Sequence, residues 1–246
     1  MIVRMSAGME ITMKQTDIIN PFQPYMTLEM DGYSQINRTD YGISHFYEFT
    51  IHDEKKHCIK AVPDASIDLL FNIGENKVST YISGTVFGVK KWELGTQDDC
   101  FGVRFQPGQG ILPKDITMEM IVNDDIEIDG DIFGKNLTEK IALAKTMSER
   151  IEIFKKAYED MVLGRNSLSD KEKINEYLVN RIGRTKGMIT MRQLEDETNY
   201  SACYLRRIFK SFHGISPKQF AQYIRFQNLL MQADKEGVRY EQVALD

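Results

Sequence analysis

The hydrophobic pattern of the chain changes once, near residue 110, and this change limits the folds that the sequence can adopt. Before it, short segments rich in Val, Ile, Phe, Tyr and Thr are separated by turn-forming residues, as is typical of β-strands. After it, apolar residues recur at three- and four-residue spacing, as is typical of amphipathic helices. The sequence therefore predicts a β-rich first part followed by a helical second part, an α+β chain.

Five segments carry the strand pattern, and they cover residues 46–51, 57–62, 66–73, 77–86 and 100–105. Several short strands at this spacing predict a barrel or a sandwich.

The helical part has clear start and stop signals. Capping boxes, in which a Ser or Thr is followed three residues later by Glu or Gln, begin at Ser169, Thr190 and Ser216. Gly214 stands where a helix ending near His213 would need a left-handed residue. A linker at 164–167 then separates two predicted domains, residues 1–165 and 166–246.

The charge of the chain is divided in the same way. The formal net charge is −5, but residues 1–168 carry −8 and residues 169–246 carry +3. From Thr198 to Ala233 there is no Asp or Glu. An acidic first part and a basic second part predict different partners for the two domains.

Composition excludes several classes of protein. No apolar run approaches the roughly 18 residues of a membrane span, and the N-terminus lacks the apolar core of a secretory signal. Three widely spaced cysteines predict neither a disulfide framework nor a zinc site. We therefore expect a cytoplasmic protein with no membrane partner.

The stretch 191–213 has the elements of a helix-turn-helix, two short helices joined by a tight turn. In its second helix, one stripe is apolar and consists of Leu205, Ile208, Phe209 and Phe212. The outer face of the same helix carries Cys203, Arg206, Arg207 and Lys210. Arg can pair with guanine in the major groove and Lys with phosphate. A merely solvated basic face is the alternative, and the absence of acids favours DNA.

The stretch from Met191 to Met231 resembles the DNA-binding half of AraC-family bacterial transcription regulators. The matching residues are Ser201, Tyr204-Leu205-x-Arg207-x-Phe209-Lys210, Gly214-Ile215-Ser216-Pro217-Lys218 and Tyr223-x-x-Phe226-Gln227 with Arg225. The resemblance implies the first of two helix-turn-helices, with residues 217–233 as the helix that connects them.

The same resemblance implies roles for single residues. Ala202, Cys203, Arg206 and Arg207 would face base edges of double-stranded DNA. Ser201 and Lys210 would contact its backbone. Cys203 can also be interpreted as a redox sensor, although a lone cysteine is more often inert.

Two departures from the family pattern stand out. Glu195 occupies a position that is usually small, so it either points outward or loosens the crossing of the two helices. Residues 240–246 can be aligned with 191–197, so the second helix-turn-helix is expected to begin there and to be incomplete.

Residues 62–73 and 102–108 resemble the N-terminal domain of one AraC-type subgroup. The resemblance implies a cupin-like barrel that senses a small-molecule effector and is followed by dimerisation helices. We place the homodimer contact on residues 147–163, with packing inside the same domain as the alternative. The residues offered for an effector pocket are Phe71, Tyr81, Trp92 and Arg104.

No catalytic or metal site is predicted. The histidines His45, His52 and His57 lack the spacing of a metal-binding cupin, and the acidic run 124–131 lacks the last ligand of a calcium loop, so we interpret it as a solvated turn. The leading hypothesis is a DNA-binding transcription regulator, not an enzyme, without a cofactor. The second is a truncated ligand-binding or dimerisation module that does not read DNA by itself.

Overall fold

The computed structural model describes residues 2–4, 10–12, 21–50, 58–75, 77–93, 99–110, 112–164 and 168–235. Its strands are β1 (Ile2–Arg4), β2 (Glu10–Thr12), β3 (Asp31–Asn37), β4 (Ile43–Thr50), β5 (Cys58–Ala61), β6 (Asp68–Ile73), β7 (Val78–Ser83), β8 (Lys90–Glu93), β9 (Asp99–Phe105) and β10 (Asp125–Ile128). Its α-helices are α1 (Pro24–Glu29), α2 (Met118–Ile121), α3 (Leu137–Leu143), α4 (Met147–Leu163), α5 (Asp170–Arg184), α6 (Met191–Thr198), α7 (Ala202–His213) and α8 (Pro217–Lys235), and its 3₁₀ turns are η1 (Asp40–Gly42) and η2 (Gly130–Phe133).

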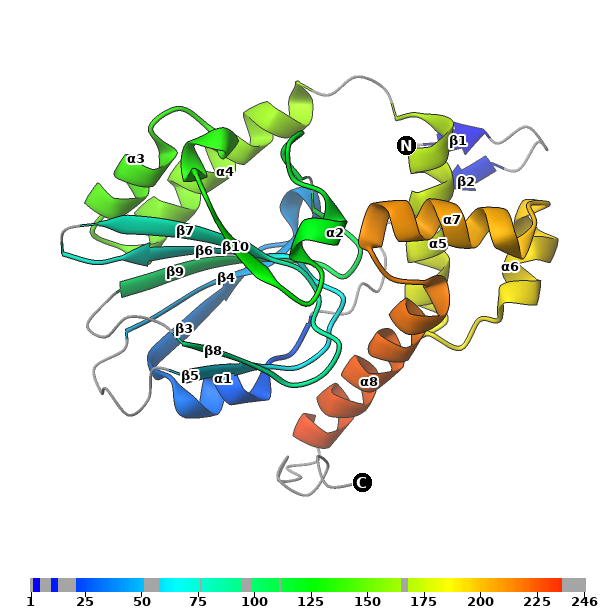
Figure 1. Cartoon of the computed structure of the whole chain (residues 1–246), viewed down its shortest axis with the longest axis horizontal. Helices are drawn as coiled ribbons and strands as arrows, with labels where there is room; N and C mark the ends of the chain where they lie inside the picture. Colours follow the sequence, from blue (N-terminus) through cyan, green and yellow to red (C-terminus); the bar gives the residue numbers. More distant parts are fainter. Residues whose placement is uncertain are drawn as a thin grey trace.

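Six strands form one antiparallel sheet in the order β10-β7-β6-β9-β4-β3 (Figure 1). The strands β5 and β8 pair separately, as do β1 and β2. All five predicted strand segments contain a strand, so the prediction of an α+β chain with a β-rich first part is confirmed. Helices α5 to α8 lie together at one end of the molecule (Figure 1).

One face of the sheet packs against α3 and α4 and forms the first core. Phe46, Phe71 and Phe101 of the sheet are fully buried there. The ring of Phe154 on α4 lies over them, with centroids 6.0 Å from Phe46 and 6.4 Å from Phe71. Aromatic side chains at these distances combine a large buried apolar area with favourable edge-to-face contacts.

The apolar stripe of α4 is used inside the chain. Ile151, Phe154 and Tyr158 are 2% exposed or less, and all three belong to the core under the sheet. The stripe on which we placed the dimer contact at 147–163 therefore packs in its own domain, because the apolar face of the sheet needs a cover. Dimerisation through the rest of this helix stays a prediction.

The opposite face, called the inner face below, lies towards α1 and the β5–β8 pair (Figure 1). Met26 and Met30 at α1 pack there with Tyr47 and Phe49 of β4. Gly102 of β9 leaves room for the ring of Tyr47, because a Cβ at Gly102 would lie 2.0 Å from a ring carbon. The inner face is thus closely packed where β4 and β9 meet.

Helices α5 to α8 build a second core around Leu178, Leu194, Leu205, Phe209 and Ile224, all buried. The predicted capping boxes of α5, α6 and α8 are present with both of their hydrogen bonds. The two halves also touch. Ala65 belongs to this second core.

Close contacts involving glycine fix how the halves meet. Gly108, after β9, lies so near Val179 of α5 that a Cβ would be 2.9 Å from its methyl groups. Gly214, after α7, has the same relation to Val122. Both glycines have positive φ, 71° and 67°, so each position favours glycine for its backbone as well as for its space.

The acidic run 124–131 is not the solvated turn that we expected. Residues 125–128 form β10, which pairs with β7 so that Glu127 lies opposite Tyr81. Ile126 and Ile128 pack against the first core.

None of the helices in the described part of the chain is long and apolar enough to cross a membrane.

Candidate nucleic-acid interface

Helices α6 and α7 are joined by a turn of three residues, 199–201. Asn199 ends α6 in the left-handed region, with φ 57°, which Asn adopts more readily than most residues. Ser201 caps α7 by accepting a hydrogen bond from the N–H of Tyr204 at 3.4 Å. At the other end of α7, Gly214 has φ 67°. The two helices and their turn therefore agree with the predicted boundaries.

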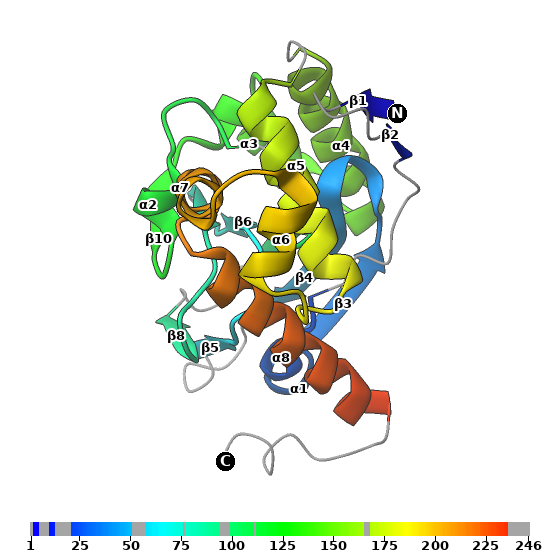
Figure 2. The same ribbon diagram turned by 90° about the vertical axis from the view of Figure 1, so that its right-hand side faces the viewer.

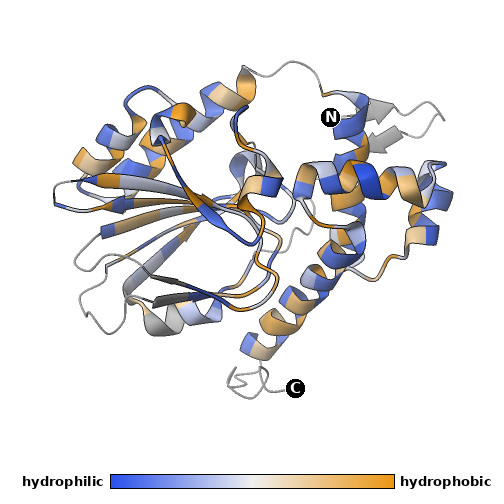
Figure 3. Ribbon diagram, viewed as in Figure 1, coloured by the Kyte–Doolittle hydropathy of each residue, from blue (hydrophilic) through white to orange (hydrophobic). Residues whose placement is uncertain are grey.

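Helix α7 has two distinct faces. Leu205, Ile208 and Phe209 are buried in the second core. Cys203, Arg206, Arg207 and Lys210 are exposed, as is Ser201, while Ala202 is half-buried. In Figure 2 the α6–α7 end of the molecule faces the viewer, and Figure 3 shows α7 as alternating hydrophilic and hydrophobic bands. The structure thus brings the six predicted DNA-contacting residues together on one helix.

Helix α6 is fastened to α5 by an ion pair. The carboxylate of Glu197 accepts from Arg181 Nε at 2.8 Å and from Nη2 at 2.6 Å, and also from the Tyr177 hydroxyl at 2.7 Å. The Arg181 hydrogen bond lowers the pKa of Glu197. Burial, together with the hydrogen bond to Glu197, raises the pKa of Tyr177 to about 12. A carboxylate with three donors is held in one orientation, which fixes the position of α6.

The contacts of Glu195 show why a glutamate fits at a position where the AraC-family pattern usually has a small residue. Its side chain is half-buried, and Oε1 accepts a hydrogen bond from the N–H of Ala202 at 2.5 Å. Glu195 therefore satisfies a free N–H at the start of α7 and crosses the turn, so it neither points outward nor leaves the crossing open.

Two basic residues near α7 are positioned by neighbours. The guanidinium of Arg207 lies 5.4 Å from the ring centroid of Tyr204, a cation–π contact that leaves Arg207 exposed. Arg225 of α8 donates a hydrogen bond to the carbonyl of Gly187. Arg225 therefore joins α8 to the segment before α6, whereas Arg207 stays available on the surface.

The four residues offered for an effector pocket do not form one site. Phe71 is fully buried between Phe101 and Phe154, because it faces the helices and fills the first core. Arg104 lies on the inner face, since its register partners are His45 and Asp68. Tyr81 is half-buried on β7. Trp92 lies on β8 opposite Ile59, and its side chain is outside the described residues.

Arg104 anchors a buried polar cluster on the inner face. Its Nε lies 3.0 and 2.9 Å from the two carboxylate oxygens of Asp68, and its Nη1 lies 3.3 Å from Oδ2 of Asp64. Tyr47 also donates to Asp68, at 3.2 Å. Burial opposes the charge of Arg104, but Asp68 and Asp64 outweigh it and raise its pKa. Burial raises the pKa of Asp64 in spite of Arg104.

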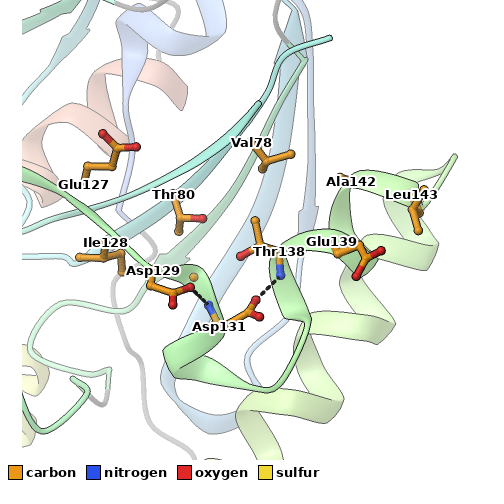
Figure 4. Close-up of a pocket in the computed structure, with 11 residues that line it drawn as sticks. Val78, Thr80, Glu127, Ile128, Asp129, Asp131, Thr138, Glu139, Ala142 and Leu143 are labelled. Carbon is orange, nitrogen blue, oxygen red and sulfur yellow. Dashed lines mark hydrogen bonds between the residues drawn. The ribbon is translucent and has the colours of Figure 1, made fainter. Parts of the chain in front are cut away.

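An open hollow of about 480 Å³ lies on the other side of the molecule, between β7, β10 and α3 (Figure 4). Two of its carboxylates serve the local backbone. Asp129 accepts from the N–H of Asp131 at 2.9 Å, and Asp131 accepts from the N–H groups of Asn136 and Thr138, both at 3.0 Å. The hydrogen bond from the backbone N–H of Thr138 lowers the pKa of Asp131. These residues start α3, and we assign no ligand to the hollow.

The histidines that the structure describes serve packing. Burial and the nearby Arg104 lower the pKa of His45 to about 3, and burial lowers that of His213 to about 3. His52 and His57 lie outside the described residues. Within the described part of the chain, no group of three or more His, Cys, Asp or Glu is placed to hold a metal ion.

Comparison with known proteins places part of the first half. Residues 41–127 match the family described as Domain of unknown function (DUF6597). The DUF6597 region runs from η1 into β10 and contains Asp64, Asp68 and Arg104, but it stops before α5 to α8. No curated protein matches the chain, and no solved structure does.

Proposed function

We propose that this chain is a sequence-specific DNA-binding transcription regulator of the AraC type. In this proposal α6 and α7 are a helix-turn-helix, α7 enters the major groove, and α8 is the connecting helix. The β-rich half is a cupin-like domain that senses an effector or forms the dimer. The observation that carries the proposal is the exposed, acid-free face of α7, which lies opposite the buried residues Leu205, Ile208 and Phe209 of the same helix.

The geometry of α7 supports direct reading of bases. Arg206 and Arg207 are adjacent and exposed, and two guanidinium groups on one helix face suit bidentate contact with guanine. Lys210 lies one turn further along, where an ammonium suits a phosphate. The ion pair of Glu197 with Arg181 holds the neighbouring helix, so α7 would reach DNA as part of a rigid unit.

A gel mobility shift tests the proposal. The probe is duplex DNA from upstream of the chain's own gene, and a scrambled duplex of the same composition is the control. Specific binding that weakens with salt supports the proposal, because counterions are released from phosphates. Dimerisation without any shift would instead support the ligand-binding or dimerisation module that does not read DNA by itself.

Single substitutions sharpen the test. Arg206→Ala or Arg207→Ala should weaken binding to the preferred duplex by about 5- to 150-fold, since a bidentate contact contributes about 1–3 kcal/mol of discrimination. Lys210→Ala should weaken binding to every duplex by a similar factor. It should also lower the slope of log affinity against log salt concentration by about 1, as for the loss of one phosphate contact. Arg38→Ala, an exposed arginine of the first half, is the matched control. Equal binding by all four variants would refute the assignment of α7.

A further inference from the structure

A buried glutamine joins the two halves of the molecule. Gln227 of α8 has no exposed surface, although its side chain is polar. Its Oε1 accepts from the N–H of Phe22 at 2.7 Å, and its Nε2 donates to the carbonyl of Pro63 at 3.0 Å. Both ends of the amide are therefore used, and both partners belong to the first half of the chain.

A second glutamine holds the same segment of the first half. Gln23 is 5% exposed. Its Oε1 accepts from the N–H of Val62 at 2.8 Å, and its Nε2 lies 2.9 Å from the carbonyl of Val62. The same Nε2 donates to Oδ2 of Asp64 at 2.8 Å. Residues 62–64 are thus held by Gln23 and by Gln227.

Asp64 carries the connection to the sheet. The oxygen that accepts from Gln23 also faces Arg104 Nη1 at 3.3 Å. Oδ1 of Asp64 accepts from the N–H of Ser66 at 2.9 Å, which fixes the turn between β5 and β6. The side chains of Arg104 and Asp64 are only 3% and 6% exposed. A buried ion pair of this kind is strongly disturbed when one partner is removed.

We propose that this polar chain couples the inner face of the sheet to α8. It runs from Arg104 through Asp64, Gln23 and the 62–64 segment to Gln227. A change in the Arg104–Asp64 pair would loosen the docking of α8 and so alter how α7 is presented. The structural coupling stands by itself, and its regulatory meaning rests on the proposed function.

The physical reason is that the four side chains of the polar chain, Gln23, Asp64, Arg104 and Gln227, are buried and each has a specified partner. A buried donor or acceptor that loses its partner costs about 1–3 kcal/mol, so one broken link favours a rearrangement of the next. The two halves of the molecule are also closely packed against each other at Gly108 and Gly214. Such a contact is either formed or opened, because close packing leaves little room for partial movement.

Hydrogen exchange followed by mass spectrometry on the whole chain tests the coupling without DNA. Gln227→Leu removes both hydrogen bonds of the amide, and Asp64→Asn removes a charge that does not touch α8. Each variant should speed exchange in peptides from residues 21–30 and from α8 by about tenfold, the equivalent of 1.4 kcal/mol of lost protection. Peptides from α4 should keep their wild-type rates.

Two matched variants separate coupling from general damage. Gln222→Leu changes an exposed glutamine of the same helix. Asp40→Asn breaks the exposed ion pair with Lys155, 3.1 Å long, in the same half as Asp64. Both should exchange like the wild type in α8. Unchanged α8 rates in Asp64→Asn, or equally faster exchange in α4, would overturn the proposal. A failed gel shift with the expected exchange pattern would overturn only the proposed function.

Discussion

The carboxylate of Glu195 accepts a hydrogen bond from the backbone N–H of Ala202, seven residues further on, across the turn between α6 and α7. This contact links the end of one helix to the start of the next. It also places a negative charge at the helix N-terminus, where a partial positive charge is present.

Removing this contact should weaken the α6–α7 pair. Glu195→Ala is expected to lower the free energy of unfolding by about 1 kcal/mol, as for the loss of an N-terminal cap. Glu195→Gln keeps an acceptor oxygen and should cost less. If α7 approaches DNA, Glu195→Gln should also strengthen binding, because a charge next to the phosphates is lost. Urea unfolding measures the first effect, with Glu152→Ala on α4 as control, and equal stability of Glu195→Ala and wild type would contradict it.

Gly102 is expected to be the least replaceable glycine of the sheet. An added Cβ would lie 2.0 to 2.5 Å from three ring carbons of Tyr47, and that ring is itself buried. Gly102→Ala should therefore destabilise the protein by about 1–3 kcal/mol through overpacking. The loss should shrink when Tyr47 is replaced by Ala in the same chain. Thermal unfolding of the single and double variants checks this, and Gly88→Ala, which has open space around it, is the control.

Gly183 should behave in the opposite way. It lies in the last turn of α5, its φ is not positive, and a Cβ there would meet no atom within 4 Å. Ala at this position should stabilise the protein by about 0.5–1 kcal/mol, because glycine loses more backbone freedom when a helix forms. Urea unfolding is again the measurement. A decrease in stability would mean that the glycine has a packing role that the structure does not show.

The sequence was most informative where the signal is local. The capping boxes at Ser169 and Thr190 and the left-handed Gly214 are each decided within four residues, and all three were predicted. In β10, Ile126 and Ile128 alternate with acidic residues, and this alternation is typical of a strand. The many acidic residues in the run 124–131 instead led us to predict a solvated turn. β3 was missed because it is an edge strand with few apolar residues.

Tertiary partners could not be predicted in the same way. The stripe of α4 shows that Phe154 is buried, but it does not say whether the partner is the same chain or another. Gln227 lies on the stripe of Phe220 and Ile224, so a buried polar group was visible in the pattern. Its partners Phe22 and Pro63 lie 205 and 164 residues away. Such pairings depend on the arrangement of the two halves, which no local pattern encodes.

His213 should make the protein less stable in acid. Burial lowers its pKa to about 3 from 6.5, and its Nε2 lies 2.8 Å from Oδ1 of Asn175. The unfolded chain therefore takes up a proton at this residue below pH 6.5, whereas the folded chain does so only near pH 3. The stability that the neutral ring contributes is complete above pH 6.5 and is lost as the pH falls through that window.

His213→Gln isolates this contribution. Gln cannot be protonated in this pH range, and its amide can still donate to Asn175. The substitution does remove the ring contacts of His213 with Phe209 and Phe220. Between about pH 7 and about pH 5, the stability of the wild type should fall by up to about 1.4 kcal/mol per pH unit for each buried histidine. Because His45 has the same lowered pKa, the variant should keep about half of this slope. Urea unfolding at a series of pH values measures this slope. Identical slopes in wild type and variant would show that the pKa of His213 is the same in the folded and the unfolded chain, whatever the variant does to stability at neutral pH.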